Sequence, residues 1–434
     1  MHSTQRLKAS DYHRIPIRLL NAAWSTLNAV GLASISLDSD SLIARAQKDT
    51  ELTDFGGDDF LEPMHLLIRS LETEADLNPV GRFMNRTNIL RLLKGRLQAQ
   101  ALFTQHPNIK ERELLDPVVI VGLARSGTTR LHRLLAADQR FLHVESWESV
   151  YPVPDQACFS ARAKGNPDPR INALDQGLKA VLYMSPQINA VHPLGTREVE
   201  EEIGLIQYGF STQLFEVQAK IPSFAEWLMS HDQTAAYTYM SDLLKLVSWF
   251  RNDPTDKPWL LKSPQHMQDL DALLNVFPNA KLLCPHRDPV KVVGSSCSMA
   301  WNALVRDSNS ITAHWVGQEW LAKTERMLRK NLSVREAVAP ENQYDVMYAD
   351  ISANWQEAMQ KIYDYLEMPL TDTACSAMQN WLDINRQHKH GAHKYSLADF
   401  GLTDEIVEEK LSFYRDRFHI PVETRNPNLT ATNQ

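Results

Sequence analysis

Cysteine is scarce in this sequence, which contains four cysteines in 434 residues. Cys158, Cys284, Cys297 and Cys375 are too few and too widely spaced to form a disulfide framework or a zinc cluster. We expect buried, small apolar side chains at these positions, in a protein from a reducing compartment. Disulfide-stabilised domains and zinc domains are therefore excluded as classes.

Long apolar runs are also missing. The first residues, MHSTQRLKASDYHR, contain none of the apolar stretch of a signal peptide. Residues 19–37 carry no charge, but asparagine, serine and threonine interrupt the apolar side chains, which favours the end of an amphipathic helix over a membrane span. We expect a cytoplasmic protein without stable membrane insertion.

Positive charge is not in excess, because the net charge of the chain is −8. This charge argues against a general nucleic-acid binder, although a pocket for a highly charged ligand needs only a few cations. Hydrophobic residues make up 43% of the chain, which is enough for a large core. Charged residues make up 23%, a fraction that predicts little disorder.

The apolar periodicity changes sharply near residue 113. Residues 1–112 have apolar side chains at helical spacing and predict a helical N-terminal extension. Across residues 113–420, short β-branched runs alternate with helical patterns, which predicts an α/β three-layer fold with a central parallel sheet. Residues 421–434 are predicted to be a C-terminal tail. The expected strands are 117–121, 259–261, 280–284 and 344–348, the expected helices after them are 128–137, 265–276, 290–300 and 355–366, and residues 155–170 are expected to form a surface loop.

A glycine loop follows the first predicted strand. Gly122 and Gly127 have the GxxxxG spacing of a phosphate-binding loop, or P-loop, between a strand and a helix. Backbone N–H groups in such a loop, together with the positive end of the following helix, attract an anion. Ser126, Thr128 and Thr129 add hydroxyl donors. The loop therefore predicts a site for phosphate or sulfate.

The loop lacks the lysine of a nucleoside triphosphatase, because Thr128 follows Gly127 where that lysine would stand. Without it, the loop has no cation for β- and γ-phosphates. Arg125 supplies a positive charge from the opposite side. The pattern thus favours a single anionic group over a triphosphate bound to magnesium.

Two blocks of the sequence resemble a known family. PVVIVGLARSGTTRLHRLLAADQRF, from residue 117, resembles the 5′-phosphosulfate loop of sulfotransferases that use 3′-phosphoadenosine 5′-phosphosulfate (PAPS). The block WLLKSPQHMQDLDALLNVFPNAKLLCPHRDPVKVVGSS, from residue 259, is similar to the segment that follows in those enzymes. The resemblance covers residues 117–366 and is to the bacterial branch, which is related to the protein-tyrosine sulfotransferases. It implies transfer of the sulfuryl group from PAPS to a hydroxyl or amine acceptor by in-line displacement, with release of PAP.

The resemblance also implies which residues bind the donor. Arg287 and Ser295 would bind the 3′-phosphate that distinguishes PAPS from ATP, since a guanidinium suits a fork of oxygens. Residues 388–395 resemble a loop that folds over PAP. Tyr348, from its position at the end of a predicted strand and not from the resemblance, is expected to place its ring near the adenine, with core packing as the alternative. The 5′-phosphosulfate would be held by Arg125, Ser126, Gly127, Thr128 and Thr129. The low charge of the sulfuryl group and the lack of a ligand cluster predict that no metal is needed.

Catalysis requires a cation at the leaving oxygen and a general base for the acceptor. Lys262 resembles the lysine that stabilises the leaving oxygen in this family, and Arg125 would assist it. Glu148 is our first choice of base and Glu145 our second, because related enzymes place a glutamate about twenty residues after the loop arginine. Further candidates for the base are Glu200, Glu201 and His266, although the acidic run at 198–202 is typical of a solvated helix face.

The sequence therefore predicts a PAPS-dependent sulfotransferase. A P-loop nucleotide or small-molecule kinase is the alternative enzyme, and a PAP-binding protein without catalytic activity is the alternative outside catalysis. The identity of the acceptor, the oligomeric state and the role of the N-terminal helices stay open.

Overall fold

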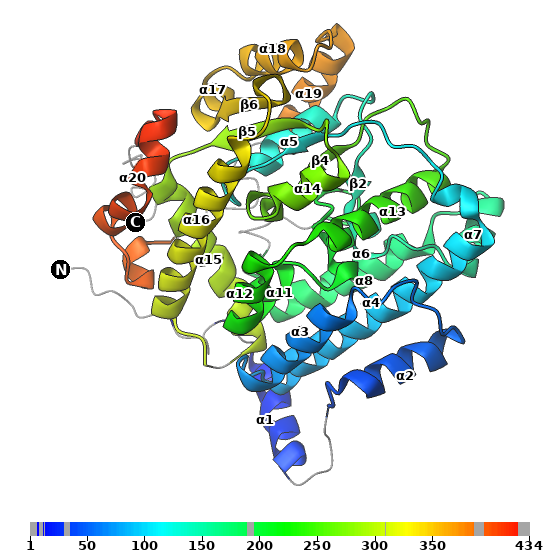
Figure 1. The fold of residues 1–434 in the computed structure, drawn as a ribbon. Coiled ribbons are helices and arrows are strands. Elements are labelled where there is room, and N and C mark those ends of the chain that lie inside the picture. The colour runs from blue at the N-terminus through cyan, green and yellow to red at the C-terminus, as the bar shows by residue number, and fades with distance from the viewer. Residues whose placement is uncertain are drawn as a thin grey trace.

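A parallel sheet of four short strands lies in the upper half of the molecule as drawn in Figure 1, between helices. The computed structural model describes residues 7, 12, 14–29, 35–188, 195–308, 310–385 and 395–423. The strands follow the order β4-β1-β5-β6 and all neighbouring pairs are parallel. Their bounds are Val118–Ile120 for β1, Leu260–Lys262 for β4, Lys281–His286 for β5 and Gln343–Met347 for β6. The four predicted strands are thus confirmed, with ends shifted by one or two residues.

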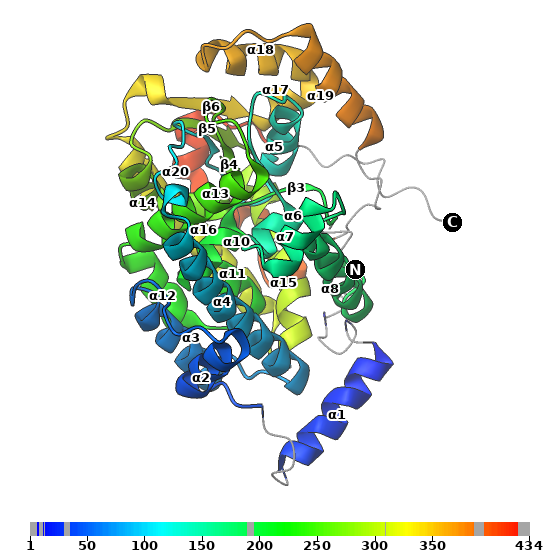
Figure 2. The same cartoon turned by 90° about the vertical axis from the view of Figure 1, so that its right-hand side faces the viewer.

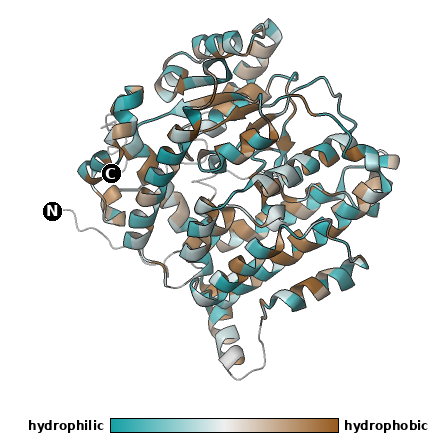
Figure 3. Ribbon diagram, in the orientation of Figure 1, coloured by the Kyte–Doolittle hydropathy of each residue, from teal (hydrophilic) through white to brown (hydrophobic). Residues whose placement is uncertain are grey.

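The strands are buried on both faces, so they are continuously apolar and not alternating. Val118 and Ile120 of β1 belong to one hydrophobic cluster, while Val119 and Val121 belong to another on the opposite face. Figure 3 shows the strands as a brown, hydrophobic centre beneath helices of mixed hydropathy. A short β-branched run is sufficient to bury the strand, because each of its side chains packs into one of the two hydrophobic clusters.

Helices cover both faces of the sheet, which confirms the predicted three-layer α/β fold. One cluster contains side chains of α5 (Thr128–Ala136), α17 (Tyr348–Ala353), α18 (Trp355–Tyr365) and α19 (Asp372–Ile384). The other contains side chains of α13 (Thr234–Arg251), α14 (Leu270–Val276), α15 (Pro289–Asp307), α16 (Ala313–Arg335) and α20 (Asp404–Phe418).

The N-terminal helices continue the second cluster. α4 (Pro79–Gln105) begins with a proline after the capping residue Asn78, whose side chain accepts from the backbone N–H of Gly81 at 2.9 Å. It packs on α15, and its side chains share one core with those of the sheet. The other helices of this region are α1 (Ile15–Ala29), α2 (Ser39–Thr50), α3 (Leu61–Thr73) and η2 (Pro107–Ile109). α1 protrudes at the lower end of the molecule in Figure 2.

The segment between α5 and β4 contains short elements that wrap one side of the sheet. Strands β2 (Val144–Glu145) and β3 (Val199–Glu200) pair antiparallel. Besides α13, the helices among the described residues of the segment are α6 (Ser146–Val150), α7 (Gln156–Ala163), α8 (Pro169–Met184), α10 (Ile203–Ile206), η3 (Gln207–Gly209), α11 (Leu214–Gln218) and α12 (Pro222–Ser230). Across the ranges that the structure describes, no helix is long and apolar enough to span a bilayer.

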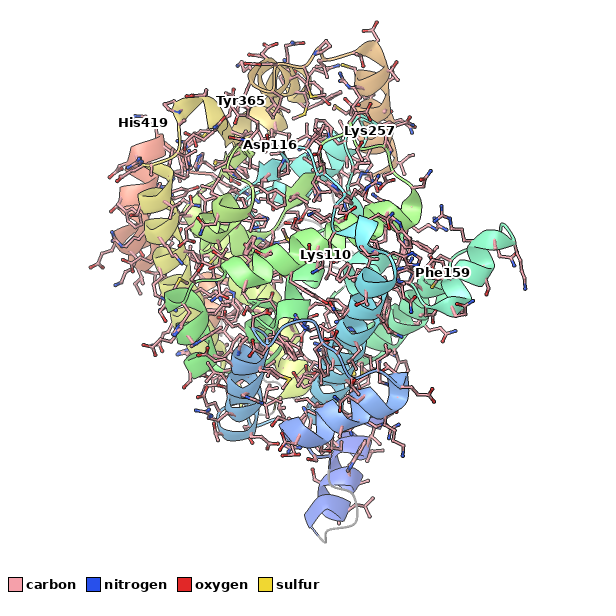
Figure 4. All side chains as sticks on the ribbon, turned by 45° about the vertical axis from the view of Figure 1, so that its right-hand side comes forward. Lys110, Asp116, Phe159, Lys257, Tyr365 and His419 are labelled. Atoms are coloured by element: carbon pink, nitrogen blue, oxygen red, sulfur yellow. The ribbon has the colours of Figure 1, made fainter. Side chains whose placement is uncertain are left out.

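The prediction of a surface loop at 155–170 is wrong, because α7 and the start of α8 lie there. Asp155 and Asp168 cap the two helices, and Pro169 occupies the first helical position of α8, where a proline is tolerated. Phe159 of α7, labelled in Figure 4, packs edge-on against Phe250 with a centroid distance of 5.2 Å. Pro169 therefore begins a helix.

Parallel pairing brings the carboxyl ends of all four strands to one edge of the sheet. The amino ends are marked in Figure 4 by Asp116 and Lys257, which precede β1 and β4. At the opposite edge lie the loop after β1, Lys262 at the end of β4, and the residues that follow β5 and β6. Ligands of open α/β sheets bind at this carboxyl edge. The remaining short helices are η4 (Pro264–Met267), η5 (Pro340–Asn342) and η6 (Leu397–Phe400).

Candidate active site

The glycine loop connects β1 to α5 and has two residues in the left-handed region. Arg125 has φ 72° and Gly127 has φ 95°. A methyl group on Gly127 would lie 2.4 Å from the ring of Tyr348, so both the backbone angle and the close approach require glycine. The first N–H groups of α5 lack helical acceptors and are available to an anion.

The hydroxyls of the loop differ in their surroundings. Ser126 is buried and donates its hydroxyl to the carbonyl oxygen of Leu123 at 2.8 Å, which closes the loop on itself. Thr128 is buried at the first position of α5, and Thr129 beside it is half-buried. Ser126 therefore stabilises the turn, while the two threonines lie where α5 presents its N-terminus.

Contacts join the loop to the segment after β5. Arg125 Nε donates to Ser295 Oγ at 2.9 Å, and Ser295 lies in α15. Arg287 Nη1 donates to the carbonyl oxygen of Arg125 at 3.0 Å. The guanidinium carbon of Arg287 lies 4.1 Å from the centroid of the Tyr348 ring. Four residues predicted to bind the donor are thus brought together from the loop after β1, the turn after β5, α15 and α17.

Arg287 also faces a carboxylate from the C-terminal segment. Its Nε and Nη2 donate to the two carboxylate oxygens of Glu423 at 2.8 and 3.0 Å. The backbone N–H of Glu423 donates to Asp288 at 2.8 Å. Beside this pair lies a cavity of about 400 Å³. Its lining residues are His286, Arg287, Asp288, Met347, Tyr348, Ala349, Ser352, Ala353, Ile420, Pro421 and Glu423.

Lys262 ends β4, beside Ile120 of β1, and is 1% exposed. Its ammonium group forms an ion pair with the carboxylate of Glu201. Its backbone N–H donates to Glu202 Oε2 at 2.9 Å. A buried ammonium group requires such a partner, since an unpaired charge is strongly disfavoured in the interior.

The first two choices of base lie on a neighbouring turn. Glu148 Oε2 accepts from the backbone N–H of Glu145 at 2.9 Å and from Arg251 Nη1 at 3.1 Å, inside a reciprocal capping box. Burial raises the pKa of Glu148, although the charge of Arg251 opposes this shift. Glu145 is more exposed and accepts from Trp147 Nε1 at 2.6 Å. Both carboxylates thus have structural partners, and the carboxylate paired with Lys262 is that of Glu201.

The interpretation of 198–202 as a solvated helix face is wrong. Glu200 lies in β3, and Glu202 is fully buried. His266 in η4 is also fully buried, with its Nε2 atom 2.5 Å from Glu202 Oε1. The sequence missed Glu202 and Glu423, because a run of glutamates or a carboxylate near a chain end gives no sign of its tertiary partner. The predicted loop over PAP lies at 388–395, and residues 386–394 are outside the described residues.

A parallel sheet with a glycine loop at its carboxyl edge places the protein among the α/β proteins with a P-loop-like fold. Residues 117–372 match the model of the Sulfotransferase family, so the chain belongs to this family and is a sulfotransferase. This membership confirms the predicted enzyme class and favours neither of the two alternatives.

Mycobacterial relatives extend the similarity over most of the chain. The omega-hydroxy-beta-dihydromenaquinone-9 sulfotransferases Stf3 of Mycobacterium bovis and Mycobacterium tuberculosis are each 24% identical over 73% of this chain and 80% of their own length. The structure of sulfotransferase STF1 from Mycobacterium tuberculosis matches with a TM-score of 0.75 and 30% identity, covering 87% of this chain and 98% of that chain. Sulfotransferase STF9 from Mycobacterium avium matches with a TM-score of 0.79 and 25% identity over 90% and 99% of the two chains.

Proposed function

We propose that the sulfuryl donor is PAPS and that the carboxyl edge of the sheet binds it. The observation that carries this proposal is that Arg125 of the loop is hydrogen-bonded both to Ser295, through its side chain, and to Arg287, through its carbonyl oxygen. These contacts support a single nucleotide whose 5′ end would meet the loop and whose 3′ end would meet the guanidinium fork of Arg287. A donor with anionic groups at both its 5′ and 3′ positions fits two such cation sites.

The proposed 3′-phosphate site opens on the cavity of about 400 Å³ that Tyr348 also lines. This volume is within the range of small-molecule pockets. The Tyr348 ring packs on the guanidinium of Arg287 and fills the space where a Cβ of residue 127 would stand, so it would link the two proposed anion sites. The adenosine would lie between the loop and Arg287, with the aromatic ring of Tyr348 nearby.

We assign the chemistry to Lys262 and Glu201. Glu201 would take the proton of the acceptor, whose oxygen attacks sulfur while the bridging S–O bond breaks and its electron pair leaves on the 5′-phosphate of PAP. Lys262 would stabilise the charge that develops on that leaving oxygen. The low charge of the sulfuryl group makes this step feasible without a metal. The ion pair of Lys262 with Glu201 supports Glu201 over Glu148 and Glu145 as the base.

We propose a hydroxyl compound as the acceptor. The mycobacterial relatives Stf3 are named for an omega-hydroxy compound, and a carboxylate base suits removal of a hydroxyl proton. A screen of hydroxyl-bearing lipids, sterols, phenols and sugars with PAPS, detected by the mass of one added sulfuryl group, identifies the acceptor class.

We also propose a reducing compartment such as the cytoplasm, which suits the four free cysteines.

The donor assignment is tested by the melting temperature with PAP and with AMP, which lacks the 3′-phosphate. We expect PAP to stabilise the protein much more than AMP, because ligand binding to the folded state raises stability with affinity. Arg287→Ala should remove this difference. Arg329→Ala is the matched control, since Arg329 also lies 4.1 Å from an aromatic centroid, that of Phe413. Equal shifts with PAP and AMP in the unmodified protein would reject the 3′-phosphate site.

The base assignment is tested by three isosteric variants, Glu201→Gln, Glu148→Gln and Glu145→Gln. Removal of a general base lowers kcat by about 10²- to 10⁴-fold. We expect this loss in Glu201→Gln, with a smaller effect in the other two. If Glu148→Gln or Glu145→Gln shows the large loss and Glu201→Gln does not, the base is one of the residues of the capping box.

A further inference from the structure

Lys262 and Glu201 are connected to a buried chain of hydrogen bonds that the proposed reaction does not use directly. The chain runs from Glu202 to His266 and on to Tyr237, and all three residues are 0% exposed. His266 Nδ1 lies 2.8 Å from the Tyr237 hydroxyl, and His266 Nε2 lies 2.5 Å from Glu202 Oε1. The residues come from three separate parts of the fold, namely the turn after β3, η4 and α13.

Glu202 accepts a hydrogen bond from the backbone of an edge strand of the sheet. β4 is one of the two edge strands and is paired on one side with β1, so its outward N–H groups need other acceptors. The N–H of Leu260 donates to the carbonyl oxygen of Leu142 at 2.7 Å. The N–H of Lys262, two residues on, points the same way and donates to Glu202 Oε2 at 2.9 Å. Glu202 thus fixes the backbone from which the Lys262 side chain extends.

Glu202 also fixes its neighbour in the chain. Glu202 immediately precedes α10 but makes no side-chain cap to that helix, because its carboxylate is directed to Lys262 and His266. Glu201 is bonded to Glu202 through the peptide chain, and its carboxylate pairs with the Lys262 ammonium. The positions of both reacting groups therefore depend on one buried carboxylate.

The hydrogen bonds of His266 follow from its partners. A carboxylate only accepts, so the Nε2 atom that faces Glu202 carries a proton. In the neutral ring, Nδ1 then accepts from the Tyr237 hydroxyl. Each group satisfies the next, and a buried network that is fully satisfied is rigid.

We propose that Glu202, His266 and Tyr237 form a positioning unit that sets the distance between the Lys262 ammonium and the Glu201 carboxylate during sulfuryl transfer. The hydrogen bonds of the three residues run to one another and to the backbone N–H of Lys262, so the unit acts through Lys262 and through Glu201, the chain neighbour of Glu202. This inference rests on the proposed roles of those two residues. A displacement of about 1 Å at a reacting group costs about 10²-fold in rate.

The test compares Glu202→Ala, Glu202→Gln and Tyr237→Phe. The rate is followed as PAP released from PAPS, with the acceptor found in the screen and, in parallel, with water alone. We expect Glu202→Ala to lower kcat by about 10²-fold, while the KM for PAPS and the calorimetric Kd for PAP change less than about twofold. Glu202→Gln should recover a large part of kcat, since its amide oxygen still accepts from the N–H of Lys262.

Tyr363→Phe is the matched control for Tyr237→Phe. Tyr363 is also 0% exposed and donates its hydroxyl to a carboxylate, Asp138 Oδ2 at 2.8 Å, on the opposite face of the sheet. The melting temperature should fall by a similar amount in both variants. The kcat should fall only in Tyr237→Phe, by about tenfold. Equal kcat in the two variants would overturn the positioning unit, as would a kcat for Glu202→Gln as low as that for Glu202→Ala.

Failure of the proposed function gives a different result. If Lys262→Met keeps its kcat, the role of Lys262 is wrong and the positioning unit is wrong with it. If Lys262→Met loses kcat while Glu202→Ala keeps it, the role of Lys262 stands and only the positioning unit is rejected.

Discussion

Glu423→Gln is expected to strengthen the binding of PAP. In the structure, the Glu423 carboxylate accepts from both Nε and Nη2 of Arg287, at 2.8 and 3.0 Å. The proposed 3′-phosphate uses this same guanidinium fork, so binding of PAP would have to displace Glu423. Replacement by glutamine keeps the size of the side chain and removes its charge.

The size of the effect follows from the exposure of the ion pair. The side chain of Arg287 is 23% exposed and that of Glu423 is 31% exposed, so water screens their attraction. Pairs of this kind contribute about 0.2–1 kcal/mol. A free energy of about 1 kcal/mol corresponds to about fivefold in a dissociation constant. We therefore expect the Kd for PAP to fall by about 1.5- to 5-fold.

Calorimetric titration with PAP and AMP measures the effect. The affinity for AMP should stay unchanged, because AMP has no 3′-phosphate to compete with Glu423. Glu319→Gln is the control, since Glu319 forms an ion pair with Arg326 on α16 and its side chain is 27% exposed. An unchanged or weaker affinity for PAP in Glu423→Gln would refute the competition for Arg287.

Three further predictions follow from individual residues. Lys262→Met should lower kcat by about 10²- to 10³-fold with a smaller change in the KM for PAPS, because the charge beside Lys262 grows only in the transition state; equal changes in both would contradict this. Gly127→Ala should weaken PAP binding at least about tenfold in a calorimetric titration, since φ is 95° and the new methyl group would meet Tyr348, whereas Gly177→Ala has open space and should bind PAP normally. Burial raises the pKa of Asp269 to about 7, so the stability that this residue contributes is present below its unfolded pKa and is lost as the pH rises through 7. Asp269→Asn should therefore match the parent melting temperature near pH 4 and exceed it at pH 8, and a difference independent of pH would show that Asp269 titrates normally.

The layered fold was predictable because each strand leaves a local signal. The run at 117–121 is apolar at every position, and β1 uses alternate residues of it for two separate cores. The segment at 155–170 was misread because Pro167 and Pro169 suggest a loop, although a proline at the first position of a helix is compatible with it. Capping aspartates distinguish a helix start from a loop in the structure. In the sequence they do not, because aspartate is equally common in turns.

The donor half of the site was more predictable than the catalytic half. Arg125, Arg287 and Ser295 stand in two blocks whose resemblance to sulfotransferases implied a common ligand, and the structure brings these three residues into contact. The base was harder to find, because a glutamate twenty residues after an arginine says little about where its side chain points. The structure directs Glu148 to a capping box and Arg251.

The sequence by itself determined the family, the parallel sheet and the glycine loop, because these depend on neighbouring residues and on motifs read along the chain. Only the tertiary structure decided the partners of the charged groups. The pairing of Lys262 with Glu201, the burial of Glu202 against His266, and the carboxylate of Glu423 on Arg287 each join residues far apart in sequence. Attraction between charges depends on distance in space and on exclusion of water, and neither quantity is written in the order of the residues.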